Sequence, residues 1–569
     1  MDVSTLKETR QQMLDAGSMF ERGSIERDGQ SYPAFVHAPK NLVDIIQSGR
    51  AHGDKDLFVY EGERWSYNSF YAQVDATHAL LVNKFGVQPG DRVCIAMRNY
   101  PDWGVVFCAT ALAGAVSVPL NSWGKTDELL YGMKDSGANI LFCDDERYAL
   151  LPDDAPEREG VQVIVVRVDA DAVADGDHAL NALTRGDVGE APGAATVDPF
   201  SPAFILYTSG STGYPKGVPL THCAVGQTLM HLFFGGALGM ALDSNPAPVA
   251  EGEPVQEALL LTVPLFHATG LFTSFIIPIQ LGAKVVLMRK WHAATALELI
   301  EREKISQMAS VPALVQSLLS DPAFDQFDTS TLKRIGSGGA ATPAGLPELI
   351  AEKLGVVTRG TGWGLSETCS VGSTSGGAVY DMCPLSAGLQ SAIMDIRTVD
   401  GDDNVLPAGE DGELELRGIT VTDGYWNRPE ATAEATHDGW WRTGDRGHVD
   451  DNGYVWITGR IKEIVIRGGE NIYPGEIEDA AYERDEVQEC VVFGVPDDAL
   501  GEELVMVYYC REQEPISVDE LRAYLKDKLA AFKVPRYIEV THEPLPQNVS
   551  NKLFKRKIRD EFMAREGLA

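Results

Sequence analysis

A short segment of the chain combines residue types that bind anions. Residues 208–217 hold four serine or threonine side chains, three glycines and one lysine, Lys216. Glycines let backbone N–H groups point at a common ligand, hydroxyl groups add donors, and a lysine adds a positive charge. The apolar run 203–207 predicts a buried strand directly before this segment. We therefore predict a loop that binds a polyphosphate, in preference to a flexible surface loop.

Two well-known nucleotide-binding patterns do not describe the chain. The P-loop pattern requires G-x-x-x-x-G-K-[ST], whereas here Pro215 precedes the lysine and Gly217 follows it. Residues 336–341 satisfy G-x-G-x-x-A, but the preceding strand is charged and Pro343 comes early in the following helix. The acidic residue expected about 20 positions further on is also missing. We interpret these glycines as a place where the backbone approaches a planar ligand closely.

Two later segments contain groups that suit a nucleotide. In 362–367, Trp363 offers a stacking surface for adenine, and Glu367 offers a carboxylate for Mg²⁺. In 441–445, Asp445 offers a carboxylate that accepts hydrogen bonds from both ribose hydroxyls. Each residue also has an ordinary interpretation: a core tryptophan, a surface glutamate, or an aspartate in a glycine-containing turn.

The composition excludes several classes of protein. The 569 residues carry a formal net charge of −35, which argues against nonspecific binding to nucleic acid, since that requires clustered Lys and Arg. The N-terminus lacks the basic start and apolar core of a signal peptide, and no apolar run looks long enough to span a bilayer. The eight cysteines form no C-x-x-C pair, which indicates reduced thiols. We expect a cytoplasmic protein without an integral membrane segment.

Alternating elements must position these residues. Strand-like runs and helical patterns alternate up to the phosphate-binding segment and again after it, which predicts layered α/β sheets. The apolar runs that predict strands are 92–97, 115–120, 139–143, 258–264 and 284–288. From Met394, short β segments separated by Gly and Asp turns predict a small β-barrel. A compact α+β unit with a capping box at 517–520 ends the chain.

The phosphate-binding segment resembles the signature of the adenylate-forming superfamily, which comprises acyl-CoA synthetases, adenylation domains and luciferases. It matches T-S-G-[ST]-T-G-x-P-K-G completely. Further motifs follow in the superfamily's order, and the resemblance covers essentially the whole chain from about residue 60. Residues 362–367 resemble [YFW]-G-x-[ST]-E, residues 441–445 resemble [YW]-[RK]-T-G-D, and 459–478 and 545–552 resemble the two C-terminal motifs.

This resemblance implies an α/β fold with two domains. The N-terminal adenylation domain, 1–461, would consist of two layered α/β subdomains and a small β-barrel. A small, mobile α+β domain, 462–569, would follow. Lys462 lies at the superfamily's hinge position, and Gly468 and Gly469 would lie against the pantetheine arm of CoA after domain rotation.

The resemblance also assigns roles in the use of ATP, Mg²⁺ and CoA. Lys552, Lys216, Glu367 and His267 would be catalytic, and Thr208 and Glu367 would bind Mg²⁺. Asn551 stands where the superfamily usually has glycine, and asparagine tolerates the left-handed backbone region better than most residues. The residues implied to bind ATP or CoA are Thr208, Ser209, Gly210, Ser211, Thr212, Gly213, Lys216, Gly338, Gly339, Ala340, Trp363, Gly364, Ser366, Asp445, Arg460, Lys462, Gly468 and Gly469.

From this resemblance we expect an ATP-dependent acyl-CoA ligase. It would convert a hydrophobic carboxylic acid, a fatty acid first of all, into an acyl-AMP and transfer the acyl group to CoA. Amino-acid adenylation domains carry an aspartate near 266–267 that binds the substrate amine, whereas residues 268–271 here are uncharged. The side chains of Phe266, Leu271, Phe272 and Phe275 form either an apolar acyl pocket or plain core.

Three alternatives remain open at this point. An aryl-CoA ligase of the 4-coumarate or benzoate type differs only in pocket residues that the sequence does not place. An acyl-AMP ligase would load a carrier protein instead of CoA. A degenerate homologue would only bind a nucleotide or serve as a scaffold. The sequence also leaves open whether the protein is a monomer or a homodimer.

Overall fold

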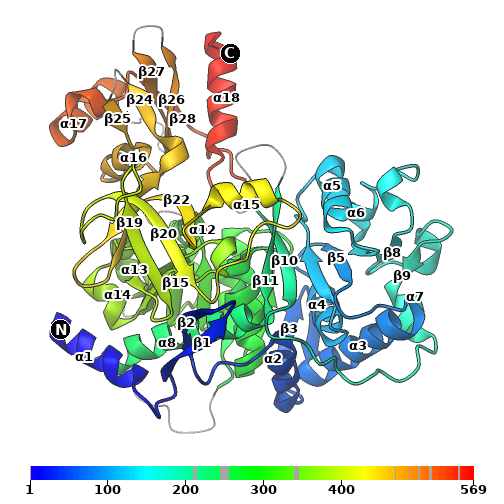
Figure 1. Cartoon of the computed structure of the whole chain (residues 1–569). Coiled ribbons are helices and arrows are strands. Elements are labelled where there is room, and N and C mark those ends of the chain that lie inside the picture. The colour runs from blue at the N-terminus through cyan, green and yellow to red at the C-terminus, as the bar shows by residue number, and fades with distance from the viewer. Residues whose placement is uncertain are drawn as a thin grey trace.

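The computed structural model shows two large sheets side by side, with a third sheet and a C-terminal unit above them (Figure 1). The first sheet lies on the right of Figure 1, and the C-terminal unit, coloured orange to red, forms the top. The structure describes residues 2–208, 215–243, 255–338, 345–355, 357–467, 470–484, 486–497, 500–511, 516–548 and 552–568.

The first sheet has seven strands in the order β11-β10-β6-β5-β7-β8-β9. Its neighbouring strands are parallel, except that β10 and β11 form an antiparallel pair. The central strands are buried on both faces, which explains why they read as continuous apolar runs. The bounds are β5 Arg92–Ala96, β6 Val116–Pro119, β7 Ile140–Cys143, β8 Gln162–Val165, β9 His178–Ala179, β10 Pro202–Thr208 and β11 Lys216–Thr221.

The second sheet has nine strands in the order β18-β17-β16-β15-β14-β12-β13-β3-β4. Strands β16 to β3 are parallel, and antiparallel strands extend both ends. The bounds are β3 Asp56–Tyr60, β4 Glu63–Ser66, β12 Ala258–Leu261, β13 Lys284–Leu287, β14 Gln307–Ser310, β15 Arg334–Gly338, β16 Thr358–Trp363, β17 Ser373–Gly376 and β18 Leu389–Gln390. Strand β12 is three residues shorter than predicted, and β15 includes the glycines Gly336 and Gly338.

The largest hydrophobic core lies between these two sheets. Helix α4, Pro101–Leu112, is buried along its entire length there, so it is apolar all round rather than amphipathic. A second core joins the opposite face of the second sheet to α11–α13. The helices of this part of the chain are α2 Leu42–Ser48, α3 Tyr67–Ala79, α5 Thr126–Ser136, α6 Asp145–Tyr148, α7 Leu180–Arg185, α9 Ala268–Leu271, α10 Ile277–Leu281, α11 Ala293–Glu303, α12 Pro312–Leu319, α13 Leu346–Leu354 and α14 Ala378–Met382.

Helix α8, His222–Ala241, corrects one sequence-based expectation. By length and composition alone it is apolar enough to cross a membrane, although no apolar run had looked long enough. It packs against the N-terminal helix α1, Val3–Leu14, and the strands β1, Arg22–Arg27, and β2, Gln30–Phe35, lie close to it (Figure 1). Because 72% of its apolar window is buried inside the protein, the helix has the character of a core helix, and its composition is weak evidence for a membrane span.

The third sheet occupies the place of the predicted β-barrel. It is an open, five-stranded, antiparallel half-barrel, with β23 paired to β22. The predicted turns at Asp400, Asp411 and Asp451 precede or separate its strands. The bounds are β19 Met394–Val399, β20 Gly412–Gly418, β21 Thr436–His437, β22 Trp440–Val449 and β23 Val455–Arg460, with helix α15, Pro429–Ala435, beside them.

The C-terminal unit is a separate α+β layer with its own cores. The predicted capping box is confirmed: Ser517 Oγ accepts from the Glu520 backbone N–H at 3.2 Å, and Glu520 Oε2 accepts from the Ser517 N–H at 3.1 Å. The bounds are β24 Val465–Arg467, β25 Glu470–Ile472, β26 Glu489–Asp497, β27 Gly501–Tyr509, β28 Tyr537–Thr541, α16 Pro474–Tyr482, α17 Val518–Lys528 and α18 Lys555–Glu566.

The predicted fold class is confirmed: two layered α/β subdomains, a small β sheet and a C-terminal α+β unit. The eight cysteines all lie in described residues and are free thiols, seven of them buried. The predicted boundary between residues 461 and 462, and the mobility of the C-terminal domain, stay predictions.

Candidate active site

The antiparallel pair β10 and β11 fixes both ends of the phosphate-binding segment. Thr208 ends β10 and lies opposite Lys216, which begins β11, and Thr208 Oγ1 contacts the Lys216 carbonyl oxygen at 3.5 Å. Thr208 and Lys216, which flank the predicted phosphate ligands, are therefore held together at the edge of the first sheet. The predicted phosphate ligands Ser209, Gly210, Ser211, Thr212 and Gly213 lie outside the described residues.

A segment at 422–426, which we call the strap, holds β11 next to the Glu367 motif. The Trp426 N–H donates to the Gly217 carbonyl at 2.8 Å, and the Thr422 N–H donates to the Glu367 carbonyl at 2.7 Å. The fit at Gly217 is tight, because a Cβ atom there would lie 3.1 Å from the Trp426 Cβ and one of the two would have to shift slightly. The strap thus sets the distance between the lysine of one motif and the glutamate of the next.

Within the strap, Tyr425 contacts two of the four predicted catalytic side chains, Glu367 and Lys216. Its hydroxyl donates to Glu367 Oε1 at 2.8 Å, and Lys216 Nζ lies 4.6 Å from its ring centroid. Glu367 is buried in the short helical turn Ser366–Thr368, which also carries Ser366. Sequence reasoning missed Tyr425, because it belongs to none of the motifs. The pair Tyr425-Trp426 directly after Gly424 was its signal in the sequence.

Two neighbouring parallel strands of the second sheet, β15 and β16, bring predicted adenine-binding residues together at their carboxyl ends. Gly338, at the end of β15, is paired with Gly362 of β16, and Trp363 ends β16. Gly364 must be a glycine, because a Cβ would overlap the Ser370 carbonyl group. Gly339 and Ala340 lie outside the described residues.

Asp445 joins Trp363 to Arg460. Trp363 Nε1 donates to Asp445 Oδ2 at 2.8 Å, and Arg460 Nε lies 2.6 Å from Asp445 Oδ1. Asp445 and Arg460 are direct partners in the β22–β23 ladder, so the sheet register itself creates this ion pair. Burial raises the pKa of Asp445, and the charges of Arg460 and Lys552 and the bond from Trp363 oppose that shift.

Lys552, the predicted catalytic lysine of the C-terminal motif, lies within electrostatic range of this group. Loss of hydration and then the charge of Arg460 lower the pKa of Lys552, while Asp445 opposes the shift. Lys552 nevertheless keeps an exposed surface, so crowding by protein rather than full enclosure reduces its hydration. Burial and then the charge of Lys552 lower the pKa of His267 to about 4. His267 is therefore neutral at pH 7 and offers hydrogen bonds instead of a positive charge.

Other predicted residues keep their roles as predictions. Lys462 lies in the single helical turn Ile461–Glu463 between the third sheet and the C-terminal unit. Gly468 and Gly469 lie outside the described residues. Leu271, Phe272 and Phe275 are fully buried in the core between the two large sheets, which favours the core interpretation over an apolar pocket. Phe266 is buried and lies against His267, with ring centroids 4.4 Å apart.

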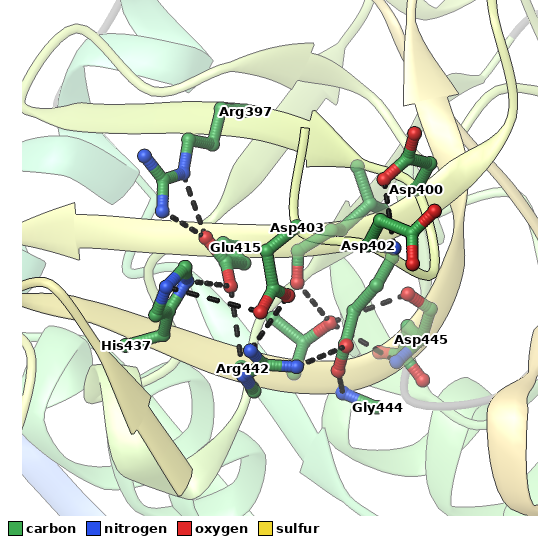
Figure 2. Close-up of polar contacts among 12 residues, drawn as sticks. Arg397, Asp400, Asp402, Asp403, Glu415, His437, Arg442, Gly444 and Asp445 are labelled. Atoms are coloured by element: carbon green, nitrogen blue, oxygen red, sulfur yellow. Dashed lines mark hydrogen bonds and ion pairs between the residues drawn. The ribbon is translucent and has the colours of Figure 1, made fainter. Parts of the chain in front are cut away.

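Beside Asp445 lies a cluster of acidic and basic side chains on the third sheet (Figure 2). Asp403, Glu415 and His437 come close enough together to hold a metal ion. However, Arg397 Nη2 lies 2.6 Å from Glu415 Oε2, and Arg442 Nη2 lies 2.7 Å from Asp403 Oδ1. Two guanidinium groups already neutralise these carboxylates, and they would repel a cation. The cluster is therefore an ion-pair network.

This network supports the turn that precedes Asp445. Glu413 Oε1 accepts from the Gly444 N–H at 3.2 Å, and Glu413 Oε2 lies 3.5 Å from Arg442 Nη1. Gly444 has a φ of +68°, which favours glycine at this position. Arg442 therefore stabilises the strand that carries Asp445.

The residues around the strap fit Mg²⁺ with a nucleotide triphosphate. Mg²⁺ prefers oxygen ligands, and the Tyr425 bond engages one oxygen of Glu367 and leaves the other, Oε2, for a further ligand. The Thr208 hydroxyl is a second oxygen at the edge of the phosphate-binding segment. Bound Mg²⁺ would neutralise charge on the triphosphate.

Two family models match the sequence, and together they cover most of the chain. The model "AMP-binding enzyme" matches residues 46–426, and "AMP-binding enzyme C-terminal domain" matches residues 476–552. The chain belongs to the adenylate-forming superfamily. Within that superfamily it is an acyl-CoA synthetase, that is, an AMP-forming acid–CoA ligase. The resemblance noted from the motifs is thus confirmed.

Relatives of this acyl-CoA synthetase are named for different acids. A feruloyl-CoA synthase of an Amycolatopsis species is 33% identical over 86% of this chain and 94% of its own. A long-chain-fatty-acid–CoA ligase of Mycobacterium tuberculosis is 30% identical over 92% of this chain and 99% of its own.

Solved structures resemble the synthetase over nearly its full length. An anthranilate CoA ligase in complex with anthranoyl-AMP has a TM-score of 0.81 at 24% identity, over 93% of this chain and 98% of its own, which supports the fold. The o-succinylbenzoate CoA synthetase of Bacillus subtilis, in complex with ATP and a magnesium ion, has a TM-score of 0.72 at 27% identity, over 91% of this chain and 99% of its own.

Proposed function

We propose that this acyl-CoA synthetase activates a hydrophobic carboxylic acid, with fatty acids as the first candidates, and transfers the acyl group to CoA. The observation that carries the proposal is the convergence of Lys552 with Asp445, Arg460 and His267. The charge of Lys552 acts on groups proposed to hold the nucleotide, which supports a role for this lysine in acyl-AMP formation. A scaffold protein without activity would not need that arrangement.

The proposed chemistry has two steps. A carboxylate oxygen of the acid attacks the α-phosphorus of ATP, and the bond to pyrophosphate breaks. Lys552 would stabilise the negative charge that builds up between carboxylate and α-phosphate, and Lys216 would stabilise the pyrophosphate. The CoA thiol then attacks the acyl carbon, and AMP leaves. Asp445 would accept hydrogen bonds from the ribose, and Trp363 would stack on adenine.

The surroundings of His267 support a hydrophobic acid. The following residues, Ala268 to Leu271, carry no charge, so nothing there would pair with a substrate amine. Because His267 is neutral at pH 7, it would not attract a second carboxylate on the substrate either. Both features disfavour amino acids and dicarboxylic acids.

An aryl acid is the second candidate, since the similar feruloyl-CoA synthase acts on an aromatic substrate. Loading of a carrier protein, a homodimeric state and a cytoplasmic location also stay untested expectations.

The test is pyrophosphate release from purified protein with ATP and a panel of acids, measured with and without CoA. The panel comprises medium- and long-chain fatty acids, ferulate, benzoate and several amino acids. We expect the fastest CoA-dependent turnover with fatty acids. Faster turnover with ferulate than with fatty acids would make aryl acids the proposed substrate class. The absence of pyrophosphate release with every acid would refute the proposed function.

A further inference from the structure

Tyr425 lies between the two residues proposed to handle the triphosphate and its metal. We propose that it is a positioning residue for metal-bound ATP: its hydroxyl orients the Glu367 carboxylate, and its ring holds the Lys216 ammonium. This inference rests on the proposed function, because it concerns the same ATP site. The contacts behind it are the 2.8 Å hydrogen bond to Glu367 Oε1 and the 4.6 Å approach of Lys216 Nζ to the ring centroid.

Tyr425 is itself held firmly enough to position other groups. Its backbone N–H donates to Thr432 Oγ1 at 2.9 Å. Its ring meets the Trp441 ring edge-on, with centroids 5.3 Å apart. Trp441 belongs to the same strand as Asp445, so Tyr425 connects the phosphate-binding segment, the Glu367 motif and the strand of the ribose motif.

The electrostatics suit this role. Burial, followed by the charge of Glu367, raises the pKa of Tyr425, so the hydroxyl remains a protonated donor. The bond occupies Glu367 Oε1 and leaves Oε2 for a further ligand. The ring face attracts the Lys216 ammonium. Lys216 and Glu367 would otherwise attract each other directly, and such an ion pair would compete with phosphate and with Mg²⁺.

Tyr425→Phe tests the hydroxyl and keeps the ring. The probe is Mn²⁺, whose binding is measured by electron paramagnetic resonance. The measurement is made in the presence of an ATP analogue with a methylene bridge between the α- and β-phosphates. We expect the Mn²⁺ dissociation constant of this complex to rise about tenfold, as for the loss of a hydrogen bond to a charged group. Affinity for the metal-free analogue should change less than about twofold, since the Lys216 contact is kept.

Tyr148→Phe is the matched control. The Tyr148 hydroxyl also donates to a carboxylate, Asp177 Oδ2, at 2.7 Å, but it lies in α6, away from the strap. Both tyrosines are partly buried, and each variant loses one hydrogen bond to a carboxylate. Tyr148→Phe also loses the bond that the Tyr148 hydroxyl accepts from the Ala174 N–H at 2.9 Å, so its midpoint of thermal unfolding should be no higher than that of Tyr425→Phe. Only Tyr425→Phe should weaken Mn²⁺ binding.

A double variant tests whether Tyr425 acts through Glu367. If it does, adding Tyr425→Phe to Glu367→Gln should change Mn²⁺ affinity far less than it does in the wild type. Unchanged Mn²⁺ affinity in Tyr425→Phe, an equal loss in Tyr148→Phe, or fully additive losses in the double variant would each overturn the inference. A wild-type protein that releases no pyrophosphate would refute the proposed function instead, so the two failures are distinguishable.

Discussion

Asp445 is a buried carboxylate with three cationic or donor groups around it. Trp363 donates to one oxygen, Arg460 pairs with the other, and Lys552 acts from a greater distance. Each of these groups favours the ionised form, whereas burial favours the protonated form and prevails. The charge of Asp445 is thus lost at a higher pH than that of an ordinary aspartate.

ATP binding should therefore weaken as the pH falls. Protonation removes the charged acceptor for the ribose hydroxyls, and it occurs earlier than usual because the pKa of Asp445 is raised. In Asp445→Asn, ATP should bind about tenfold more weakly at neutral pH, as for a lost hydrogen bond to a charged group. Titration calorimetry at a series of pH values should also show that this variant lacks the additional acid-side loss of the wild type.

Asp395→Asn controls for the loss of an Arg–Asp pair on the same sheet. Asp395 Oδ2 lies 3.0 Å from Arg417 Nη2 and is more exposed than Asp445. The Asp395→Asn variant should bind ATP like the wild type at every pH. Parallel pH profiles for wild type and Asp445→Asn would contradict the role of this carboxylate.

Sequence patterns identify residues of this kind but not their contacts. Trp363 and Asp445 are each predictable from a motif, yet the hydrogen bond between them joins positions 82 residues apart. Tyr425 was not predicted at all, because an aromatic residue in a loop between motifs has no characteristic spacing. The pairing of Asp445 with Arg460 follows only from the register of two strands.

At the scale of elements, the strap depends on one small residue. A Cβ at Gly217 would lie 3.0 Å from Ile205 Cγ2 and 3.1 Å from the Trp426 Cβ. Gly217→Ala should push the strap away from β11, at a cost of about 1–3 kcal/mol for overpacking. We expect a lower midpoint of thermal unfolding together with weaker ATP binding, because Tyr425 and Glu367 move with the strap.

Gly236→Ala provides the comparison. Gly236 is exposed on α8, and a Cβ there would meet no atom within 4 Å. Alanine should stabilise this helix by about 0.5–1 kcal/mol through its higher helix propensity. Equal unfolding midpoints for the two variants would mean that the strap tolerates the extra atom, and the account of Gly217 would be wrong.

Elements were predicted best where burial forces a clear pattern. The apolar runs 92–97, 115–120 and 139–143 became strands of the first sheet because helices cover both faces. At 271–275 the sequence left two alternatives, an apolar pocket wall and plain core, and the structure buries these side chains in the core. Composition does not distinguish these two outcomes, since a pocket wall and a core use the same residue types.

At the scale of the whole molecule, individual side-chain contacts join the C-terminal unit to the rest of the described chain. The Arg446 guanidinium lies 4.3 Å from the Tyr473 ring centroid, and Arg511 Nη1 donates to the Ser320 carbonyl at 3.0 Å. Lys555 lies 3.0 Å from carboxylate oxygens of both Glu463 and Glu478, which ties α18 to the turn that contains Lys462. Contacts of this kind are individually weak enough to exchange during a domain rotation.

The turn at Lys462 is the proposed hinge of that rotation. Lys462→Pro fixes φ and removes a backbone N–H, so it should hinder a large change in the backbone angles. We expect it to slow acyl transfer to CoA far more than acyl-AMP formation, with no loss of fold by circular dichroism. Lys462→Ala leaves the backbone free and should retain both steps. Full overall turnover in Lys462→Pro would show that the domain does not need to move at this position.

The most direct test of the account is the effect of Lys552→Ala on the two half-reactions. In this structure Lys552 acts on Asp445 and His267, so its loss should reduce acyl-AMP formation by on the order of 10²-fold or more. Transfer to CoA from supplied acyl-AMP should be much less affected. Lys557→Ala, which removes an exposed lysine of α18, should leave both steps unchanged. Equal loss of both half-reactions in Lys552→Ala, or no loss of adenylation, would contradict the proposed placement of the catalytic lysine.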